Sequence, residues 1–306
     1  MSVLVIIVTY NAMQWAARCL DSLRDSAIPL DVFVFDNGST DGTQDFIRSG
    51  YPNVLFCQNT ENEGFGKANN RGLQYAIEKG YDYVYLMNQD AWIQKNTIQD
   101  LVRIAESHPK YGIVGPVQLD GTGHHLELQF CRSTLRSDIT LSDYFSDLYF
   151  REDGERDIYP VSYLMASHWL VSRKCLLAVG GFSPVFFHYG EDDNYIQRVI
   201  FHGFKLGLAP HVTAIHDCHV RKSNPTVMNS VYREYVGFLV LLSQPATSYS
   251  FLGPIYVFCF YAIKKRNSAY FKYAWKMIRE KRRIVECRNA SIRGFAFLET
   301  VPSQDA

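Results

Sequence analysis

Apolar runs of strand length alternate with helically spaced apolar positions along the first 120 residues. VLVIIV, at residues 3–8, has the uninterrupted hydrophobicity of a parallel strand that is covered on both faces. Ala16, Leu20 and Leu23 then recur at helical spacing, and Pro29 separates them from the next apolar run. Further strand-like runs follow with helices between them, so the pattern predicts an α/β fold with a mostly parallel, Rossmann-like central sheet. The expected strands cover residues 3–8, 31–35, 54–57 and 81–87.

The pattern is less regular after the fourth expected strand. A helix capped by Asn96 or Thr97 follows, and a short apolar run at 113–116 comes after it. Residues 120–156 are polar and irregular, which is more typical of a functional loop or an excursion than of filler. Hydrophobic positions then resume and lead into a helix that ends at Gly203.

Polar residues gather where the expected strands end. Short polar segments follow the first, second and fourth strands, and another opens the helix beyond the irregular stretch. Ligands of open α/β sheets bind at the carboxyl ends of the strands, so these clusters are candidates for one binding site. The four clusters are Thr9–Asn11, Asp36–Thr43, Asn88–Asp90 and Glu191–Asp193.

Composition narrows the class of protein and of partner. The 306 residues are 47% hydrophobic, which is enough for one large domain with an appendage, or for two domains. The 31 basic and 31 acidic residues cancel, so no overall field attracts nucleic acid. Seven cysteines are scattered without a C-x-x-C pair, as is typical of reduced thiols. Because the first residues do not read as a secretory signal, we expect a cytoplasmic protein.

Five segments, in this order, resemble family 2 glycosyltransferases of the GT-A fold. The branch that they resemble builds bacterial cell-surface polysaccharides and includes rhamnosyltransferases. The resemblance covers about the first 220 residues and implies a GT-A catalytic domain over 1–224, with a nucleotide-binding half at about 1–118 and an acceptor half at about 119–224. A C-terminal helical extension would cover 225–306. The segments are VTYN, FDNGSTDGT, NEGFGKANNRGL, YLMNQDAW, and RKCLLAVGGFSPVFFHYGEDDNYIQRV with AIHDCH.

The resemblance implies an inverting enzyme that moves a sugar from a nucleotide diphosphate to a hydroxyl group of a glycan or a lipid-linked acceptor. Two other classes stay open. A sugar-phosphate nucleotidyltransferase would carry a glycine-rich, basic loop after the first strand, where this chain has YNAM. A non-catalytic protein that binds sugar nucleotides or carbohydrates is the other alternative. An NAD-dependent oxidoreductase is disfavoured, because GFGKAN lacks the third glycine of the dinucleotide motif and follows the third strand.

The expected donor is a UDP- or dTDP-linked sugar held at the strand ends. Asp36 can accept a hydrogen bond from a pyrimidine N–H, and the resemblance implies the same contact. Gly64 permits close approach of the backbone to a ligand, and the resemblance places Lys67 and Asn70 in the wall of the donor pocket. Alternatively, the segment after the second strand is only a turn in which Asp41 caps a helix. The predicted donor-binding residues are Thr9, Tyr10, Asn11, Asp36, Asn37, Ser39, Gly64, Lys67, Asn70, Asn88, Gln89 and Asp90.

Asp90 is the candidate ligand for a divalent cation. Relatives carry Asp-x-Asp at this position, whereas the first acid is replaced here by Asn88. The resemblance implies Mg²⁺ or Mn²⁺ between Asp90 and the donor phosphates, with His216 as the second protein ligand. A histidine at a strand end is also commonly structural. Residues 217–219 lack a second ligand pair at metal-site spacing, which argues against zinc.

Asp192 is the predicted general base. It lies at the start of a helix, where the dipole favours an ionised carboxylate. Its place in the matching motif implies that it removes the acceptor proton, while Glu191 orients the acceptor or Asp192 itself. The alternative is a helix N-terminus that carries acids for stability alone. One base without a second carboxylate nucleophile predicts a single displacement, which inverts the anomeric centre.

The C-terminal segment differs in composition from the rest. Residues 251–263 are apolar but shorter than the ~20 residues that a membrane span needs, and Gly253 with Pro254 interrupts them. The segment from there to Arg293 is basic, with aromatic residues interleaved. It would lie on an anionic leaflet at the inner face of the plasma membrane, or pack as helices with a solvated basic face. Nucleic acid is not expected as a partner.

Overall fold

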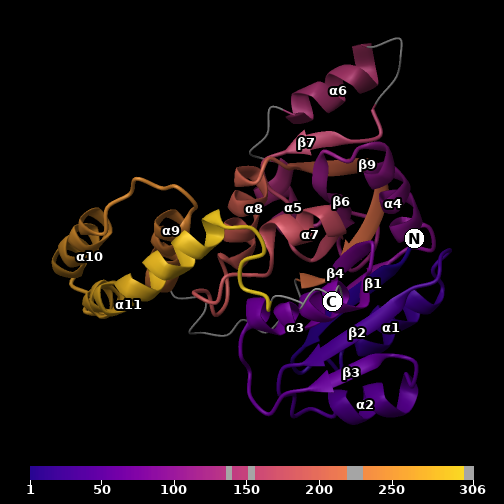
Figure 1. Ribbon diagram of the computed structural model, residues 1–306, viewed down its shortest axis with the longest axis horizontal. Helices are drawn as coiled ribbons and strands as arrows, with labels where there is room; N and C mark the ends of the chain where they lie inside the picture. The colour runs from indigo at the N-terminus through magenta and orange to yellow at the C-terminus, as the bar shows by residue number, and fades with distance from the viewer. Residues whose placement is uncertain (136–139, 151–155, 219–229, 300–306) are drawn as a thin grey trace, which may run out of the picture.

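The computed structural model describes residues 1–135, 140–150, 156–218 and 230–299, which form a central sheet, covering helices and a helical extension at one side (Figure 1). The strands are β1 (Val3–Thr9), β2 (Asp31–Asp36), β3 (Leu55–Gln58), β4 (Tyr83–Asn88), β5 (Ala91–Ile93), β6 (Tyr111–Leu119), β7 (Tyr159–Val161), β8 (His168–Ser172) and β9 (Lys205–His216). The helices are α1 (Ala16–Arg24), α2 (Thr43–Gly50), α3 (Phe65–Lys79), α4 (Thr97–Ser107), α5 (Leu128–Phe130), α6 (Thr140–Phe150), α7 (Arg173–Val179), α8 (Glu191–Phe201), α9 (Ser230–Ser243), α10 (Leu252–Lys264) and α11 (Ala269–Ile292).

The four strands predicted from the sequence form the parallel half of the sheet. The order across the sheet is β3-β2-β1-β4-β8-β6-β9-β5, and β7 also pairs with β9. β1 lies between β2 and β4 and is parallel to both, with Thr9 opposite Asp36 and Val8 opposite Asn88. Parallel neighbours need crossover connections, which α1, α2 and α3 provide. The Rossmann-like core is therefore confirmed.

The other half of the sheet is mixed. β8 runs antiparallel to both β4 and β6, and β5 and β7 run antiparallel to β9, whereas β6 and β9 are parallel. The insertion of β8 brings the residues before it to the end of β4, where the N–H of Asn88 donates to the carbonyl of Ser167 at 3.2 Å. This insertion therefore links the middle of the chain to the edge where the polar clusters lie.

Apolar side chains fill both faces of the sheet. In β1, Leu4 and Ile6 point into one core and Val5 and Ile7 into the other, and all four are buried. This alternation is what a central strand requires, because successive side chains point to opposite faces. Helices α3, α7 and α8 contribute to the first core, and α1 and α4 contribute to the second.

The sequence predicted where α8 ends and where α4 begins. Gly203, with φ +85°, follows α8, and the next N–H, that of Phe204, donates to the carbonyl of Val199 at 3.1 Å. Glycine takes this left-handed conformation at least cost, so the predicted end of the helix is confirmed. Asn96 precedes α4 without a side-chain cap hydrogen bond, and the hydroxyl of Thr97 donates to Thr213 instead. The predicted cap position is confirmed, because Asn96 is the N-cap residue, but no side-chain hydrogen bond caps the helix.

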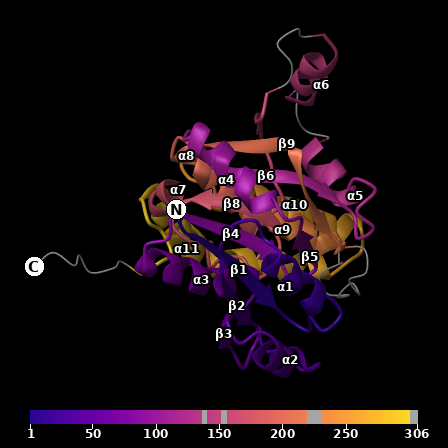
Figure 2. The ribbon, with the colours of Figure 1, turned by 90° about the vertical axis from the view of Figure 1, so that its right-hand side faces the viewer.

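Residues 120–156 contain short helices where the sequence predicted irregular structure. Glu127 accepts the N–H groups of Gln129 and Phe130 and so begins α5, and a π-helical turn follows it. Helix α6 projects away from the sheet in both views (Figures 1 and 2). Its periodicity is not recognisable because its large apolar side chains are mostly exposed, among them Phe150 at 86%. The irregular prediction was wrong for these elements.

Helices α9, α10 and α11 share an apolar core of their own beside the sheet (Figure 1). Asn194 in α8 donates its amide to the carbonyl of Ser243 in α9, at 3.3 Å. Residues beyond α11 return to the part of the chain that contains the sheet, where the N–H of Gly181 donates to the carbonyl of Ala296 at 2.8 Å. The predicted C-terminal extension is thus helical within residues 230–299, while the boundary near 224 lies outside the described residues.

Candidate active site

Three of the four polar clusters meet at the carboxyl edge of the parallel strands. Thr9 ends β1, Asp36 ends β2 and Asn88 ends β4, and the strand register places them side by side. This is the arrangement that the sequence predicted from the positions of the strand ends. The fourth cluster opens α8, which packs on the face of the sheet that α3 also covers.

Asp36 orders the loop that follows β2. Its carboxylate is 0% exposed and accepts hydrogen bonds from two hydroxyls, one side-chain amide and two backbone N–H groups. The hydroxyl donors are Thr9 and Ser39, at 2.8 and 2.5 Å. Asp41 accepts the N–H of Thr43 at the start of α2, but the N-cap residue is Gly42 and not Asp41 as predicted. The loop therefore has the turn geometry of the alternative interpretation, and the contact between Asp36 and a nucleobase stays a prediction.

Hydrogen bonds join the segment after β1 to the segments that follow β4 and β2. The amide of Gln89 pairs with both backbone groups of Tyr10, at 2.7 and 3.2 Å. Asn11 has a positive φ of 52°, and its side-chain oxygen accepts the N–H of Thr40 at 2.8 Å. Its own N–H donates to the hydroxyl of Ser39. These bonds hold Tyr10, 47% exposed, at the rim of the strand-end edge.

The turn before α3 is held by Asn37. Its amide oxygen accepts the N–H of Glu63, and its amide nitrogen donates to the side chain of Asn62, both at 2.9 Å. Gly64 has a φ of +90°, and a Cβ there would clash with the carbonyl oxygen of Phe187. The close backbone approach expected at Gly64 is therefore to the segment just before α8. The glycine brings the start of α3 and the start of α8 together.

Lys67 and Asn70 differ in their surroundings. Lys67 is exposed on α3. Asn70 has both amide atoms engaged by the backbone of Phe182, at 2.6 and 2.9 Å. Asn70 thus braces the chain ahead of α8, and the donor contacts of both residues stay predictions.

Asp90 and His216 lie together although they are far apart in sequence. β5 pairs with β9 so that Ala91 is opposite His216, and the N–H of Asp217 donates to the carbonyl of Asp90 at 2.8 Å. The imidazole Nε2 lies 3.5 Å from Asp90 Oδ1 and 3.4 Å from the amide nitrogen of Asn88. Asp90 is 0% exposed and His216 2%.

The surroundings of this pair suit a divalent cation. Within the described residues, the buried Oδ1 of Asn88 and Nδ1 of His216 have no hydrogen-bond partner. Buried polar atoms are normally satisfied, so each of these two atoms could accept a ligand or an ion that completes its bonding. Carboxylate, amide oxygen and imidazole are all donors that Mn²⁺ accepts. The residues present therefore fit the cation that the sequence predicted.

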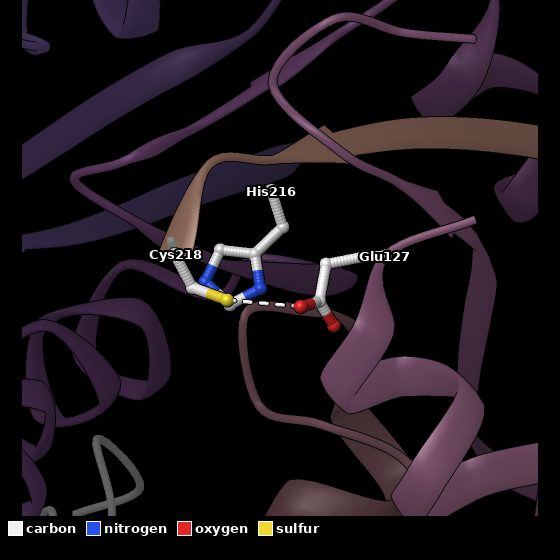
Figure 3. A group of neighbouring side chains, drawn as sticks. All are labelled: Glu127, His216 and Cys218. Carbon is white, nitrogen blue, oxygen red and sulfur yellow. Dashed lines mark hydrogen bonds between the residues drawn. The ribbon is translucent and has the colours of Figure 1, made fainter. Parts of the chain in front are cut away.

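Glu127 and Cys218 extend the cluster around His216 (Figure 3). One ligand-type atom from each of the three residues lies within 4.8 Å of the others, and the thiol of Cys218 donates to Glu127 Oε1 at 2.9 Å. The sequence did not single out either residue, because Glu127 comes from the irregular stretch. Cys218 was visible only as part of the segment 217–219, whose last residue lies outside the described residues.

The first turn of α8 holds three consecutive acids, of which Glu191 is buried and Asp192 and Asp193 are half-buried. Burial, followed by the charge of Asp192, raises the pKa of Glu191 to about 8, and the same two causes raise the pKa of Asp193 to about 7. Burial also raises the pKa of Asp192, against hydrogen bonds from Tyr163 and from backbone N–H groups, which lower it. Glu191 and, in part, Asp193 therefore hold protons near neutral pH. The pKa of Asp192 is raised as well, but Asp192 is the acid of the three whose carboxylate accepts a side-chain hydrogen bond, from Tyr163, that favours the ionised form.

Tyr163 connects Asp192 to the strand-end edge, a role that the sequence did not indicate. Its hydroxyl donates to Asp192 Oδ2 at 2.6 Å. Four residues later, Ser167 accepts the N–H of Asn88 and donates its hydroxyl to Gln118 at 2.8 Å. Four residues span at most ~14 Å. One short segment thus touches both the acid at α8 and the end of β4.

Comparison with known proteins identifies the family. A family model described as "Glycosyl transferase family 2" matches residues 4–176. The chain is 30% identical over 229 residues to the N-acetylglucosaminyl-diphospho-decaprenol L-rhamnosyltransferase of Mycobacterium tuberculosis, which covers 69% of this chain and 75% of the relative. It is 24% identical over 219 residues to the dTDP-rhamnosyl transferase RfbF of Shigella flexneri, covering 70% and 69% of the two chains.

Solved structures share the fold at lower sequence identity. S. aureus TarS in complex with UDP-GlcNAc has a TM-score of 0.55 at 14% identity, over 95% of this chain and 82% of TarS. The mannosyltransferase PcManGT from Pyrobaculum calidifontis, in complex with GDP-Man and Mn²⁺, has a TM-score of 0.52 at 21% identity. That match covers 78% of this chain and 61% of PcManGT.

The sheet, its carboxyl-edge site and these neighbours define a GT-A fold. The chain belongs to glycosyl transferase family 2. It is a glycosyltransferase that uses a nucleotide sugar as donor. The two alternatives, a nucleotidyltransferase and a non-catalytic binding protein, are not favoured, because the matched family consists of glycosyltransferases.

Proposed function

We propose that the sugar is transferred in one inverting displacement, with Asp192 as the general base and the donor held at the strand-end edge near Asp90. The observation that carries this proposal is the segment 163–167, which binds Asp192 through the hydroxyl of Tyr163 and binds Asn88 through the carbonyl of Ser167. It supports a single site in which the acceptor lies against α8 and the donor lies against β4.

Proton transfer follows from the protonation states of the three acids. The Asp192 carboxylate takes the proton of the acceptor hydroxyl while the oxygen forms a bond to the anomeric carbon. The bond from that carbon to the diphosphate oxygen breaks, and the electron pair leaves with the nucleotide diphosphate. Glu191, protonated near neutral pH, would donate a hydrogen bond that orients the acceptor or Asp192. A single step of this kind inverts the anomeric centre.

The donor would be a UDP- or dTDP-linked sugar. RfbF is a dTDP-rhamnosyl transferase, and TarS was solved with UDP-GlcNAc, so both nucleotides have precedent among similar proteins. Tyr10, Asn11 and Gln89 would form the rim of the nucleotide site. A carboxylate has about four acceptor positions, and protein donors take all of those of Asp36. Asp36 would therefore bind the base only by giving up one of these hydrogen bonds.

A divalent cation, Mg²⁺ or Mn²⁺, would be held by Asp90 and His216. When bound, it would supply positive charge opposite the departing diphosphate. PcManGT was solved with GDP-Man and Mn²⁺, which supports a cation at the donor site of this fold. Of the protein's own residues, Asn88 would turn its buried Oδ1 toward the same site.

The acceptor would be a lipid-linked glycan of cell-surface polysaccharide synthesis. The mycobacterial relative is named for an acceptor built on decaprenol diphosphate, which supports a lipid-linked acceptor here. Within the described residues no two cysteines are joined by a disulfide bond, which favours a reducing compartment. We therefore place the reaction in the cytoplasm, at the inner face of the plasma membrane.

Thermal denaturation with a panel of UDP- and dTDP-sugars tests the donor site. We expect one nucleotide class to raise the melting temperature of the wild type when Mn²⁺ is present, and EDTA to remove the effect, because the cation links Asp90 to the diphosphate. Asp90→Asn should raise the Mn²⁺ concentration needed by at least about tenfold. Asp100→Asn, an exposed acid on α4, is the matched control. Equal Mn²⁺ dependence in Asp90→Asn and the wild type would overturn this assignment.

A further inference from the structure

Helix α10 is apolar on all sides, although one side faces solvent. Leu252, Tyr256 and Ile263 fall on one face and are 77%, 71% and 72% exposed. The opposite face is buried, with Phe258 at 0% and Ala262 at 4%. A helix that is hydrophobic all round is normally buried on all sides. The outward face of α10 is therefore as apolar as a surface that a membrane or another molecule covers.

Helix α11 carries a second outward apolar stripe. Phe271, Trp275 and Ile278 are spaced by four and three residues, lie on one face, and are 48%, 62% and 48% exposed. The inward face contains Met277, which is fully buried in the core shared with α9 and α10. Two helices that share one core thus each carry large exposed apolar side chains, and clustered exposed apolar side chains commonly mark an interaction surface.

Basic residues flank these apolar faces. Lys272 follows Phe271, and Arg279 follows Ile278, so both lie on the exposed side of α11. At the end of α10, the ammonium of Lys264 lies 5.6 Å over the ring of Phe260. Trp, Phe and Ile on one face with Lys and Arg beside them are typical of helices that lie in the interface of an anionic bilayer.

Charge separates this surface from the exposed aromatic residues of α6. Phe145, Tyr149 and Phe150 are also exposed there, but α6 carries Asp143 in its first turn and no basic residue in its last turn. An anionic leaflet would repel such a helix. In the part of the chain that the structure describes, no helix combines the length and the hydrophobicity needed to cross a bilayer. The surface on α10 and α11 is therefore suited to lie on a membrane.

We propose that the outward faces of α10 and α11 dock the enzyme on an anionic bilayer. This deepens the proposed use of a lipid-linked acceptor and rests on it, because α9 joins the docking helices to α8, whose first turn carries the acids. The amide of Asn194 in α8 bonds Ser243 in α9, and the hydroxyl of Tyr232 in α9 donates to the carbonyl of His188 at 2.8 Å. Docking would hold the first turn of α8 at a fixed position relative to the lipid surface.

Trp275 provides a direct probe of docking. It is the only one of the four tryptophans that is more than a third exposed, since Trp15 and Trp169 are buried and Trp92 is partly buried. The full chain would be mixed with phosphatidylcholine vesicles, with or without phosphatidylglycerol, and vesicle flotation measured. We expect binding at least about tenfold tighter to the anionic vesicles. Lipids brominated on their acyl chains should quench the fluorescence of Trp275.

Surface variants separate docking from folding and from catalysis. Trp275→Ser should weaken vesicle binding about tenfold, and Lys272→Glu with Arg279→Glu should remove the preference for anionic lipid. Phe150→Ser, which changes a more exposed aromatic residue on α6, should leave vesicle binding unchanged. Nucleotide release from a water-soluble donor should stay within twofold of the wild type in Trp275→Ser, so failure of docking and failure of the proposed chemistry are distinguishable.

Three results would overturn docking through these faces. The first is equal binding of the wild type to neutral and anionic vesicles. The second is flotation without quenching of Trp275, which would place the lipid contact elsewhere. The third is a concentration-dependent dimer that shields Trp275 from an aqueous quencher without vesicles, because a second copy of the chain would then be the partner of these faces.

Discussion

The hydroxyl of Tyr163 is the residue-scale feature on which the assignment of Asp192 rests most directly. It donates to Asp192 Oδ2 at 2.6 Å and favours the ionised carboxylate. In Tyr163→Phe the pKa of Asp192 should rise further, because burial remains and one stabilising hydrogen bond is lost. We expect the acidic limb of the pH profile of kcat/KM to move to higher pH by about one unit, with recovery of activity at alkaline pH.

A matched tyrosine tests whether this shift is specific. Tyr81 also donates its hydroxyl to a carboxylate, that of Asp31, at 2.8 Å, but it lies at the opposite end of β4. Tyr81→Phe should therefore leave the pH profile unchanged. A profile that is identical in Tyr163→Phe and the wild type would show that the tyrosine has no part in positioning or charging Asp192.

At the scale of elements, the buried acid at the N-terminus of α8 makes the free energy of unfolding depend on pH. A free glutamate titrates near pH 4.5, whereas the pKa of Glu191 in the folded chain is raised to about 8 by burial and by Asp192. Between these values the folded state binds more protons than the unfolded state, so the free energy of unfolding falls as pH rises. Stability from this group is highest in mild acid and is lost toward pH 8.

Glu191→Gln should remove this pH dependence. Glutamine resembles the protonated side chain, so we expect the variant to match the wild type at pH 4.5 and to exceed its free energy of unfolding at pH 8 by on the order of 2 kcal/mol. Urea unfolding at the two pH values measures the difference. Glu106→Gln, an exposed acid on α4, serves as control. A variant that is less stable than the wild type at pH 8 would mean that Glu191 is ionised and satisfied there.

Local patterns predicted the parallel strands and the strand-end position of the site. The apolar run of β1 and the polar residues at Thr9, Asp36 and Asn88 are sufficient, because parallel strands bring their carboxyl ends to one edge. The pairing of Asp90 with His216 was reached only through resemblance. It depends on β5 lying beside β9, and pairing between distant strands leaves no local periodicity.

Other site residues left no sequence signal. Tyr163 is one tyrosine among 20, and only the antiparallel insertion of β8 brings its segment to the end of β4. Glu127 reads as a loop acid until α5 begins at it. The helices within residues 120–156 were missed for a related reason, since α6 is not amphipathic toward a core. Residues whose role depends on contacts between distant segments are those that local patterns do not reveal.

At the scale of the whole molecule, the C-terminal extension is fastened back onto the catalytic part. The backbone of Ala296 pairs with the Gly180–Gly181 turn ahead of α8, and the ring of Phe297 lies 4.8 Å from the buried guanidinium of Arg198. Glu299 pairs with the side chain of Gln74 in α3. These contacts connect the extension to the two helices that border the site.

Truncation tests how much the contacts of Ala296, Phe297 and Glu299 contribute to stability. A chain that ends after Arg293 would lose all of these contacts and leave Arg198 with Tyr195 but without Phe297 beside its guanidinium. We expect its melting temperature to fall by at least about 3 °C, as a loss near 1 kcal/mol produces in a chain of this size. A chain that ends after Glu299 keeps every contact and is the control. Equal melting temperatures for the two truncated chains would show that the contacts of residues 294–299 add nothing to stability.

The proposed catalytic role of Asp192 is tested most directly by comparing turnover with donor binding in Asp192→Asn. The measurement uses a UDP- or dTDP-sugar that stabilises the wild type, and it records both the donor Kd and the rate of nucleotide release with Mn²⁺ present. We predict a donor Kd within about threefold of the wild type and a loss of at least about a hundredfold in turnover, because the asparagine keeps the shape but cannot take a proton. Turnover close to that of the wild type, or loss of donor binding with turnover, would contradict the account.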